Sequence, residues 1–197
     1  MAGSRRRLGI AMSVILAGPC AVAGSAAEPA VVLHIDDRAG VPPRELAAAT
    51  VIVERTFQAA GVAIIGIEGR FPASITGPNA DFPHARHLAV MLVNNGEDST
   101  RGVTGCALGF ATPRLAVAYA FYNRIVDWSW KRPVDLTVVL GRVIAHEIGH
   151  LLLPPNSHSR FGIMRADLDL GVSNPDRFTD DQARTIRARL VRRAPGD

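Results

Sequence analysis

Two histidines and a glutamate in the stretch HEIGH have the types and spacing of a metal-binding helix. His146 and His150 are four residues apart, so on a helix they lie one turn apart on the same face, with about 5–6 Å between their Cβ atoms. Both imidazoles can then direct a ring nitrogen at a single ion. Glu147 lies one residue round from His146, where its carboxylate can reach a water on that ion without binding the ion itself.

The chemistry that this arrangement predicts is hydrolysis by an activated water. Zinc lowers the pKa of a bound water toward about 7 and polarises a substrate carbonyl, and a neighbouring carboxylate takes the proton. We therefore expect Zn2+ as the cofactor and Glu147 as the general base. The plainer interpretation is a pair of core histidines that bind the backbone. It is disfavoured because His146, His150 and Glu147 would be costly to bury in an apolar helix without a partner.

A catalytic zinc ion usually has three protein ligands and leaves its fourth position to water, so one further ligand must come from outside the helix. His158 lies eight residues after His150, and the chain between them contains two prolines and is long enough to reverse and return. Asp167 and Asp169 are the acidic alternatives. We expect His158 to be the third ligand.

The HEIGH helix, the turn, the later histidine and then Gly162, Ile163 and Met164 together resemble the metzincin clan of zinc peptidases. In that clan a methionine turn lies beneath the metal, and Met164 is the matching position. Its apolar thioether can pack under histidine rings without competing strongly for the ion. The motif resemblance covers Val134 to about Arg165, and beyond it only the order of elements agrees.

Two positions depart from the pattern of that clan. The clan has a glycine three residues after the second histidine and its third histidine six residues after it, where this chain has Leu153 and Asn156. The prolines and Asn156 can make the turn instead of a glycine. The amide oxygen of Asn156 is a poor zinc ligand beside an imidazole. The clan places all three ligands before the methionine turn, which favours His158 over Asp167 and Asp169.

Apolar periodicity and capping residues predict three helices. Residues 44–60 carry apolar side chains at helical spacing. A longer pattern begins after Asp135 as N-cap and should end at about Leu152, because the prolines that follow disfavour the α conformation in the residue before them. A last helix has Thr179 as N-cap and Gln182 in the capping-box position.

Short runs of β-branched and apolar residues between turn formers predict five strands. They are residues 30–37, 62–69, 87–95, 105–112 and 114–126. The last of these runs is also compatible with a short helix. Together with the metzincin resemblance, this order implies an α+β fold, in which a mixed twisted sheet is packed with two long helices and a C-terminal helix follows a zinc cleft. There is no internal repeat, so we expect one domain over residues 28–197.

The N-terminal 27 residues have the pattern of a secretory signal peptide. Three arginines precede an apolar run from Leu8 to about Val22, and a stretch of small residues follows. The run is too short to span a bilayer, and no later segment reaches the roughly 18 apolar residues that a spanning helix needs. We therefore expect a secreted or periplasmic protein without a stable membrane anchor. Ordinary secretory and twin-arginine export both stay open.

Charge and cysteine content limit the remaining possibilities. Removing the three arginines of the signal lowers the formal charge from +4 to +1, so a general attraction to nucleic acid is not expected. Cys106 is the only cysteine after the signal, and no internal disulfide can form. His34, His84 and His87 are interpreted as surface or strand histidines, not as a second metal site.

The sequence thus predicts a secreted, monomeric, single-domain zinc endopeptidase that acts on peptides or proteins. Two alternatives remain. The first is a catalytically inactive zinc-binding module, which is disfavoured because a purely structural site does not require Glu147. The second is a zinc hydrolase of another clan, with Asp167 or Asp169 as its acidic third ligand. No segment predicts which peptide bond is cleaved.

Overall fold

The computed structural model describes residues 28–69, 87–94, 107–166 and 176–191. The predicted signal peptide, His84, Cys106 and both acidic candidates for the third ligand, Asp167 and Asp169, lie outside these residues. Within them, no helix has the length and apolar character that crossing a membrane requires.

Five strands form one sheet, with the order β2-β1-β3-β5-β4. The strands are β1 (Ala30–Asp37), β2 (Ala63–Glu68), β3 (His87–Val93), β4 (Gly109–Thr112) and β5 (Val117–Phe121). β1 pairs in parallel with β2 and β3, and β3 pairs in parallel with β5. β4 runs antiparallel to β5 and forms one edge of the sheet. The expected mixed, mostly parallel sheet is therefore present.

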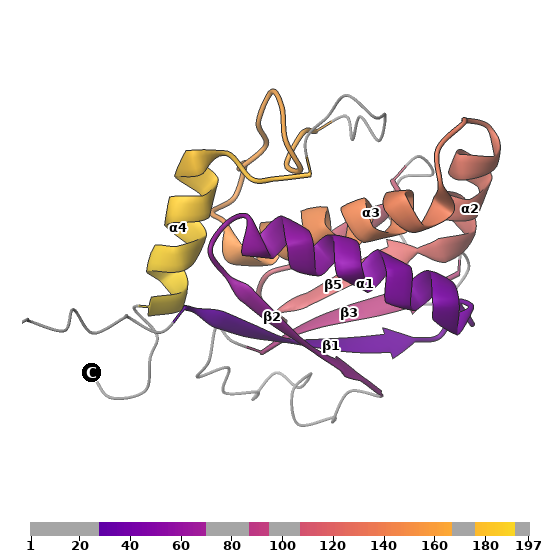
Figure 1. Ribbon diagram of the computed structural model, residues 1–197, viewed down its shortest axis with the longest axis horizontal. Helices are drawn as coiled ribbons and strands as arrows, with labels where there is room; N and C mark the ends of the chain where they lie inside the picture. The colour runs from indigo at the N-terminus through magenta and orange to yellow at the C-terminus, as the bar shows by residue number, and fades with distance from the viewer. Residues whose placement is uncertain (1–27, 70–86, 95–106, 167–175, 192–197) are drawn as a thin grey trace, which may run out of the picture.

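Two long helices, α1 (Pro43–Gln58) and α3 (Leu136–Leu152), lie side by side over one face of this sheet (Figure 1). Gly141 of α3 allows their close approach, because a Cβ atom there would lie 2.7 Å from the carbonyl oxygen of Ala49 in α1. The expected α+β fold, with a mixed sheet packed with two long helices, is confirmed.

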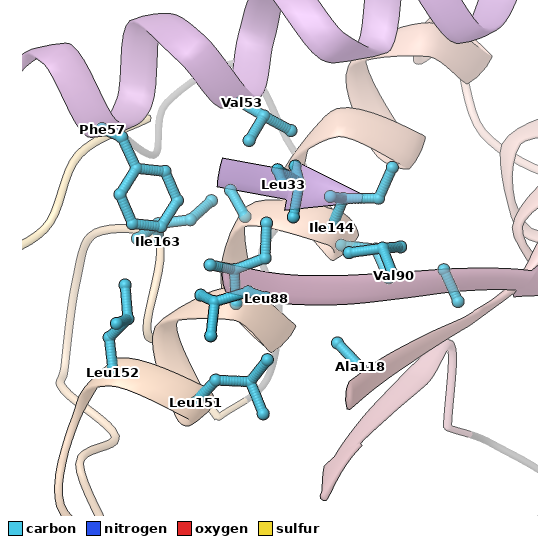
Figure 2. Close-up of a cluster of buried hydrophobic side chains, with 14 of the residues drawn as sticks. Leu33, Val53, Phe57, Leu88, Val90, Ala118, Ile144, Leu151, Leu152 and Ile163 are labelled. Atoms are coloured by element: carbon cyan, nitrogen blue, oxygen red, sulfur yellow. The ribbon is translucent and has the colours of Figure 1, made fainter. Parts of the chain in front are cut away.

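The core lies between the sheet and these two helices (Figure 2). Leu33 of β1 and Val90 of β3 project from the sheet, Phe57 from α1, and Ile144 from α3. All four side chains are buried. Because strand residues alternate between the two faces, β1 presents every second side chain to this core. The core fixes α3, the helix that carries the HEIGH motif, against the sheet.

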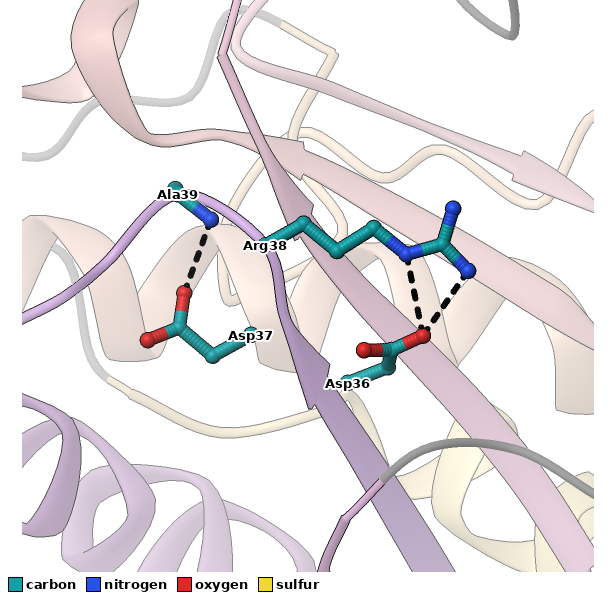
Figure 3. A network of polar contacts seen from close by, with 4 residues as sticks. All are labelled: Asp36, Asp37, Arg38 and Ala39. Atoms are coloured by element: carbon teal, nitrogen blue, oxygen red, sulfur yellow. Dashed lines mark hydrogen bonds and ion pairs between the residues drawn. The ribbon is translucent and has the colours of Figure 1, made fainter.

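The connection from β1 to α1 is closed by aspartate side chains (Figure 3). Asp37 accepts hydrogen bonds from the backbone nitrogens of Ala39 at 3.0 Å and Val41 at 2.8 Å. Arg38 folds back and donates to the buried Asp36 from both Nε and Nη2, at 3.0 and 2.9 Å. The bonds to Asp37 satisfy backbone donors where the strand ends.

The helix boundaries follow the predicted capping residues. The side chain of Asp135 accepts a hydrogen bond from the backbone nitrogen of Thr137 at 2.7 Å, as expected of the N-cap of α3. The last helix, α4 (Asp180–Val191), begins with a reciprocal capping box. The Thr179 nitrogen donates to Gln182 Oε1 at 3.0 Å, and the Gln182 nitrogen donates to Thr179 Oγ1 at 3.3 Å.

The strand expected over residues 114–126 is only partly present. β5 ends at Phe121, and a helix, α2 (Tyr122–Trp130), continues directly from it, so the strand and the alternative short helix are each present in part of this run. The apolar run is continuous across this junction, and periodicity alone does not separate a buried strand from a short helix. The burial of Ile125 and Ser129, four residues apart, marks the helical face.

Candidate metal centre

The three predicted histidine ligands converge on one point. His146 and His150 come from successive turns of α3, and His158 comes from the loop that follows. One ring nitrogen from each lies within 4.8 Å of the other two. His150 Nε2 lies 3.0 Å from His146 Nε2 and 3.2 Å from His158 Nε2. Two imidazole nitrogens bound to one tetrahedral zinc ion are about 3.3 Å apart, so these separations suit a shared ion.

A backbone carbonyl sets the orientation of the His146 ring. His146 Nδ1 lies 2.7 Å from the carbonyl oxygen of Ile163. Because a carbonyl oxygen only accepts, Nδ1 carries the proton in this bond, and the lone pair of Nε2 faces the other histidines. Such a bond to the second ring nitrogen is the usual support of a metal-binding histidine. No local sequence pattern predicts this contact, because Ile163 is 17 residues away and its side chain takes no part.

Burial keeps the first two histidines neutral. It lowers the pKa of His146 to about 4, although the bond to Ile163 acts in the opposite direction. It also lowers the pKa of His150 to about 4, with a smaller contribution from His158. A metal ion binds the neutral imidazole, so both rings are in the binding form near neutral pH.

Glu147 is buried beside the cluster and touches the edge strand. Its side chain is 6% exposed, and this burial raises the pKa of its carboxyl group to about 8. A Cβ atom on Gly109 of β4 would lie 2.8 Å from Glu147 Cγ and 2.9 Å from Glu147 Oε1. Gly109 thus provides the space for the carboxylate. No sequence pattern identifies Gly109 as part of the site, because only the packing of β4 against α3 brings Gly109 and Glu147 together.

Met164 lies directly against the helix that carries the first two histidines. It is fully buried, and a Cβ atom on Gly149 of α3 would overlap its sulfur atom. The turn before it is held by the bond from the Ser159 nitrogen to the Met164 carbonyl, at 2.8 Å. Gly162, with φ +84°, supplies the left-handed conformation that the turn needs. The methionine thus packs against α3 at Gly149, the residue before the second histidine.

The loop between α3 and His158 is made by residues that the sequence analysis proposed for the turn. α3 ends at Leu152, and Leu153 is extended. Asn156 has φ +62°, a conformation that asparagine adopts more readily than most residues. The chain then returns toward the helix, and His158 reaches the other two rings. Asn156, at the spacing where the metzincin pattern has its third histidine, therefore makes the turn.

His34 and His87 form a separate pair on the adjacent strands β1 and β3. His34 Nε2 lies 3.1 Å from His87 Nδ1. Burial lowers the pKa of His34, and the neighbouring His87 lowers it further. Both residues lie on strands, as expected, and their contact is not predicted from the sequence.

An open cavity of about 780 Å³ adjoins the three histidines and Glu147. The edge strand β4 and the prolines after α3 contribute to its wall. The larger apolar side chains of its described lining include Leu108, Phe110 and Trp128, and Arg189 of α4 adds a basic group. The cluster is therefore open to a ligand of considerable size.

The residues of the centre fit zinc. Three imidazoles form a common zinc donor set, and the cavity leaves space for a fourth ligand. The buried carboxylate of Glu147 adjoins the same cavity, where it can exchange a proton with a molecule bound at the cluster. The arrangement thus brings together three candidate metal ligands, space for a further ligand and a buried carboxyl group.

Comparison with known proteins adds structural similarity but no sequence relative. No protein-family model and no curated protein matches the chain. The chain is similar to the solved structure of a zinc-dependent peptidase from Methanocorpusculum labreanum, with a TM-score of 0.46 and 16% identity over 81% of this chain and 99% of that one. It is also similar to archaemetzincin from Methanopyrus kandleri, with a TM-score of 0.48 and 16% identity over 85% of this chain and 99% of that one.

Proposed function

We propose that this protein is a zinc-dependent endopeptidase with a metzincin-like centre. The observation that supports it most strongly is the convergence of three imidazole nitrogens beside a buried carboxylate at the wall of an open cavity. His146, His150 and His158 are the proposed metal ligands, and Glu147 is the proposed general base.

Each residue of the centre has a role that follows from its position. A zinc ion held by the three histidines would act as a Lewis acid and would lower the pKa of a water bound to it. Glu147 accepts the proton of the attacking water and delivers it to the leaving amine. Burial raises the pKa of its carboxyl group to about 8 in the absence of a metal ion, and the positive charge of a bound zinc ion would favour the ionised form that a base requires. Ile163 holds the His146 ring through its carbonyl.

The position of β4 supports an extended peptide as substrate. β4 is the antiparallel edge strand of the sheet, and Gly109 to Ala111 line the same cavity as the histidines. An extended peptide can pair with the backbone of an edge strand, which holds its scissile bond close to the base. Pairing of this kind uses main-chain groups, so it does not determine which side chains are preferred.

The experiment that tests this function is cleavage of a peptide library followed by mass spectrometry. We expect cleavage by the zinc-loaded protein, loss of cleavage after chelation, and recovery when zinc is restored. Glu147→Gln keeps the size of the side chain but removes the proton acceptor, so cleavage should fall by roughly 10²-fold or more. Glu54→Gln is the matched control, since Glu54 is exposed on α1.

The two alternatives give different results in the same experiment. An inactive zinc-binding module would hold zinc and cleave no peptide in any form. A hydrolase with an acidic third ligand would cleave, but it would depend on Asp167 or Asp169 and not on His158. Full activity of the Glu147→Gln variant would show that the base is wrongly assigned.

We also propose that the protein is exported and acts as a monomer outside the cytoplasm. The arginines and the apolar run before residue 28 support the export part of this proposal. Mass spectrometry of the native protein should give an N-terminus between Gly24 and Glu28. An intact Met1 on a protein recovered from the cytoplasm would contradict export.

A further inference from the structure

The third histidine lies on the most exposed part of the proposed metal centre. His146 is buried and His150 half-buried, whereas His158 is exposed and follows three exposed residues, Pro154 to Asn156. His158 also stands two residues later than the metzincin pattern has its third histidine. A longer, exposed loop loses more conformational freedom when its ligand is fixed, so an anchor from outside the loop matters here.

A glutamine of the last helix reaches this loop. Gln182, in the first turn of α4, is 9% exposed, and its Nε2 donates a hydrogen bond to the carbonyl oxygen of Ser157 at 2.8 Å. The carbonyl carbon of Ser157 is bonded to the backbone nitrogen of His158. The hydrogen bond therefore fixes the peptide plane from which the third histidine departs.

The same side chain also caps its own helix. Gln182 Oε1 accepts the hydrogen bond from the Thr179 nitrogen, so both ends of the amide are used. A capping box accepts glutamate or glutamine at this position. Only glutamine has an NH2 group that can also donate to Ser157. The second contact thus accounts for an amide at a position where a carboxylate would cap equally well.

We propose that Gln182 is a positioning residue for the third metal ligand, His158, and that it links the C-terminal helix to the metal centre. The inference rests on the proposed zinc function. Gln182 acts through the Ser157 peptide and not on the substrate. Its contribution is to hold the loop so that His158 is placed before the ion arrives.

The substitution Gln182→Glu separates positioning from capping. Glutamate keeps the acceptor for the Thr179 nitrogen, but it loses the donor to Ser157 and turns an acceptor toward a carbonyl. Zinc affinity, measured by competition with a chromophoric chelator, should fall by roughly 10- to 100-fold. The thermal midpoint of the metal-free protein should change little, because the cap is retained.

Two further variants complete the comparison. Thr179→Ala removes the hydroxyl that accepts a hydrogen bond from the backbone nitrogen of Gln182, so it should lower the thermal midpoint and leave zinc affinity unchanged. Gln182→Met keeps the length of the side chain but removes both of its hydrogen bonds, so it should reduce zinc affinity and thermal midpoint together.

A double-mutant cycle tests whether the effect passes through His158. In a His158→Ala background, Gln182→Glu should cause no further loss of zinc affinity. An equal loss in both backgrounds would overturn the inference, and so would unchanged affinity of the single Gln182→Glu variant. Neither result would affect the proposed zinc function. Failure of the native protein to bind zinc at all would overturn both proposals.

Discussion

Two glycines leave space for two side chains of the proposed metal centre. Gly109 of β4 faces Glu147, and Gly149 of α3 faces Met164. Neither belongs to the histidine and glutamate pattern that predicts the metal centre from the sequence. Each is needed because a methyl group at that position would collide with a side chain on another element.

Gly109→Ala should reduce catalysis without removing the metal. The added Cβ would lie 2.9 Å from Glu147 Oε1 and 2.7 Å from the Tyr119 carbonyl oxygen, so the carboxylate or the edge strand must move. We expect kcat to fall by roughly 10- to 100-fold, because a small displacement of a catalytic group is costly. Gly66→Ala is the matched control, since a Cβ there meets nothing within 4 Å. Full activity of Gly109→Ala would contradict the assigned contact.

Gly149→Ala should destabilise the protein directly. Its methyl group would overlap the Met164 sulfur atom and lie 3.0 Å from Phe178 Cε1. Overpacking of this kind typically costs about 1–3 kcal/mol of unfolding free energy, which urea denaturation of the metal-free protein measures. In a Met164→Ala background the cost should shrink, because the sulfur atom is gone. An equal loss of unfolding free energy in both backgrounds would show that Met164 is not in close contact with α3 at Gly149.

At the scale of elements, the helix α3 depends on its N-terminal cap. Hydrogen bonds from the hydroxyl and the backbone nitrogen of Thr137 hold the pKa of Asp135 below its ordinary value of 3.8. A depressed folded pKa means that the carboxylate stabilises the fold above the ordinary pKa and that this contribution is lost as the pH falls through the folded value.

Asp135→Ala should therefore lower the unfolding free energy by about 1 kcal/mol near neutral pH. The difference from the native protein should narrow once the pH falls below the folded pKa of Asp135. Urea denaturation at neutral pH and at a pH below the folded pKa of Asp135 measures this difference in unfolding free energy. Asp135→Asn, which keeps a capping side chain but cannot titrate, is the control. A difference that is the same at both pH values would show that the ionised carboxylate is not the source of the stability.

The elements that the sequence predicts well are those with local signals. The bounds of α3 follow from Asp135 and from the prolines after Leu153, and the start of α4 follows from Thr179 and Gln182. The boundary between β5 and α2 has no such signal, because one apolar run crosses it. For the same reason, the His, Glu and Met positions of the centre can be read from spacing, while the supporting contacts from Ile163 and Gln182 depend on packing between distant segments.

At the scale of the whole molecule, the topology of the sheet brings the centre together. β4 follows β3 in sequence but lies beyond β5 in the sheet, so it becomes an edge strand that packs on α3. α4 returns to the far end of α3, where it contacts the loop that carries His158 (Figure 1). The proposed cleft is thus built from three parts of the chain, of which β4 contributes no motif that is visible in the sequence.

The central claim is that three histidines of this fold hold one zinc ion, and its most direct test is zinc stoichiometry and affinity. We expect one tightly bound zinc per native chain by native mass spectrometry, and loss of tight binding in His158→Ala. His87→Ala, a strand histidine outside the cluster, should retain the ion, as should Asp167→Ala and Asp169→Ala. Tight, stoichiometric zinc in His158→Ala together with its loss in either aspartate variant would contradict the account.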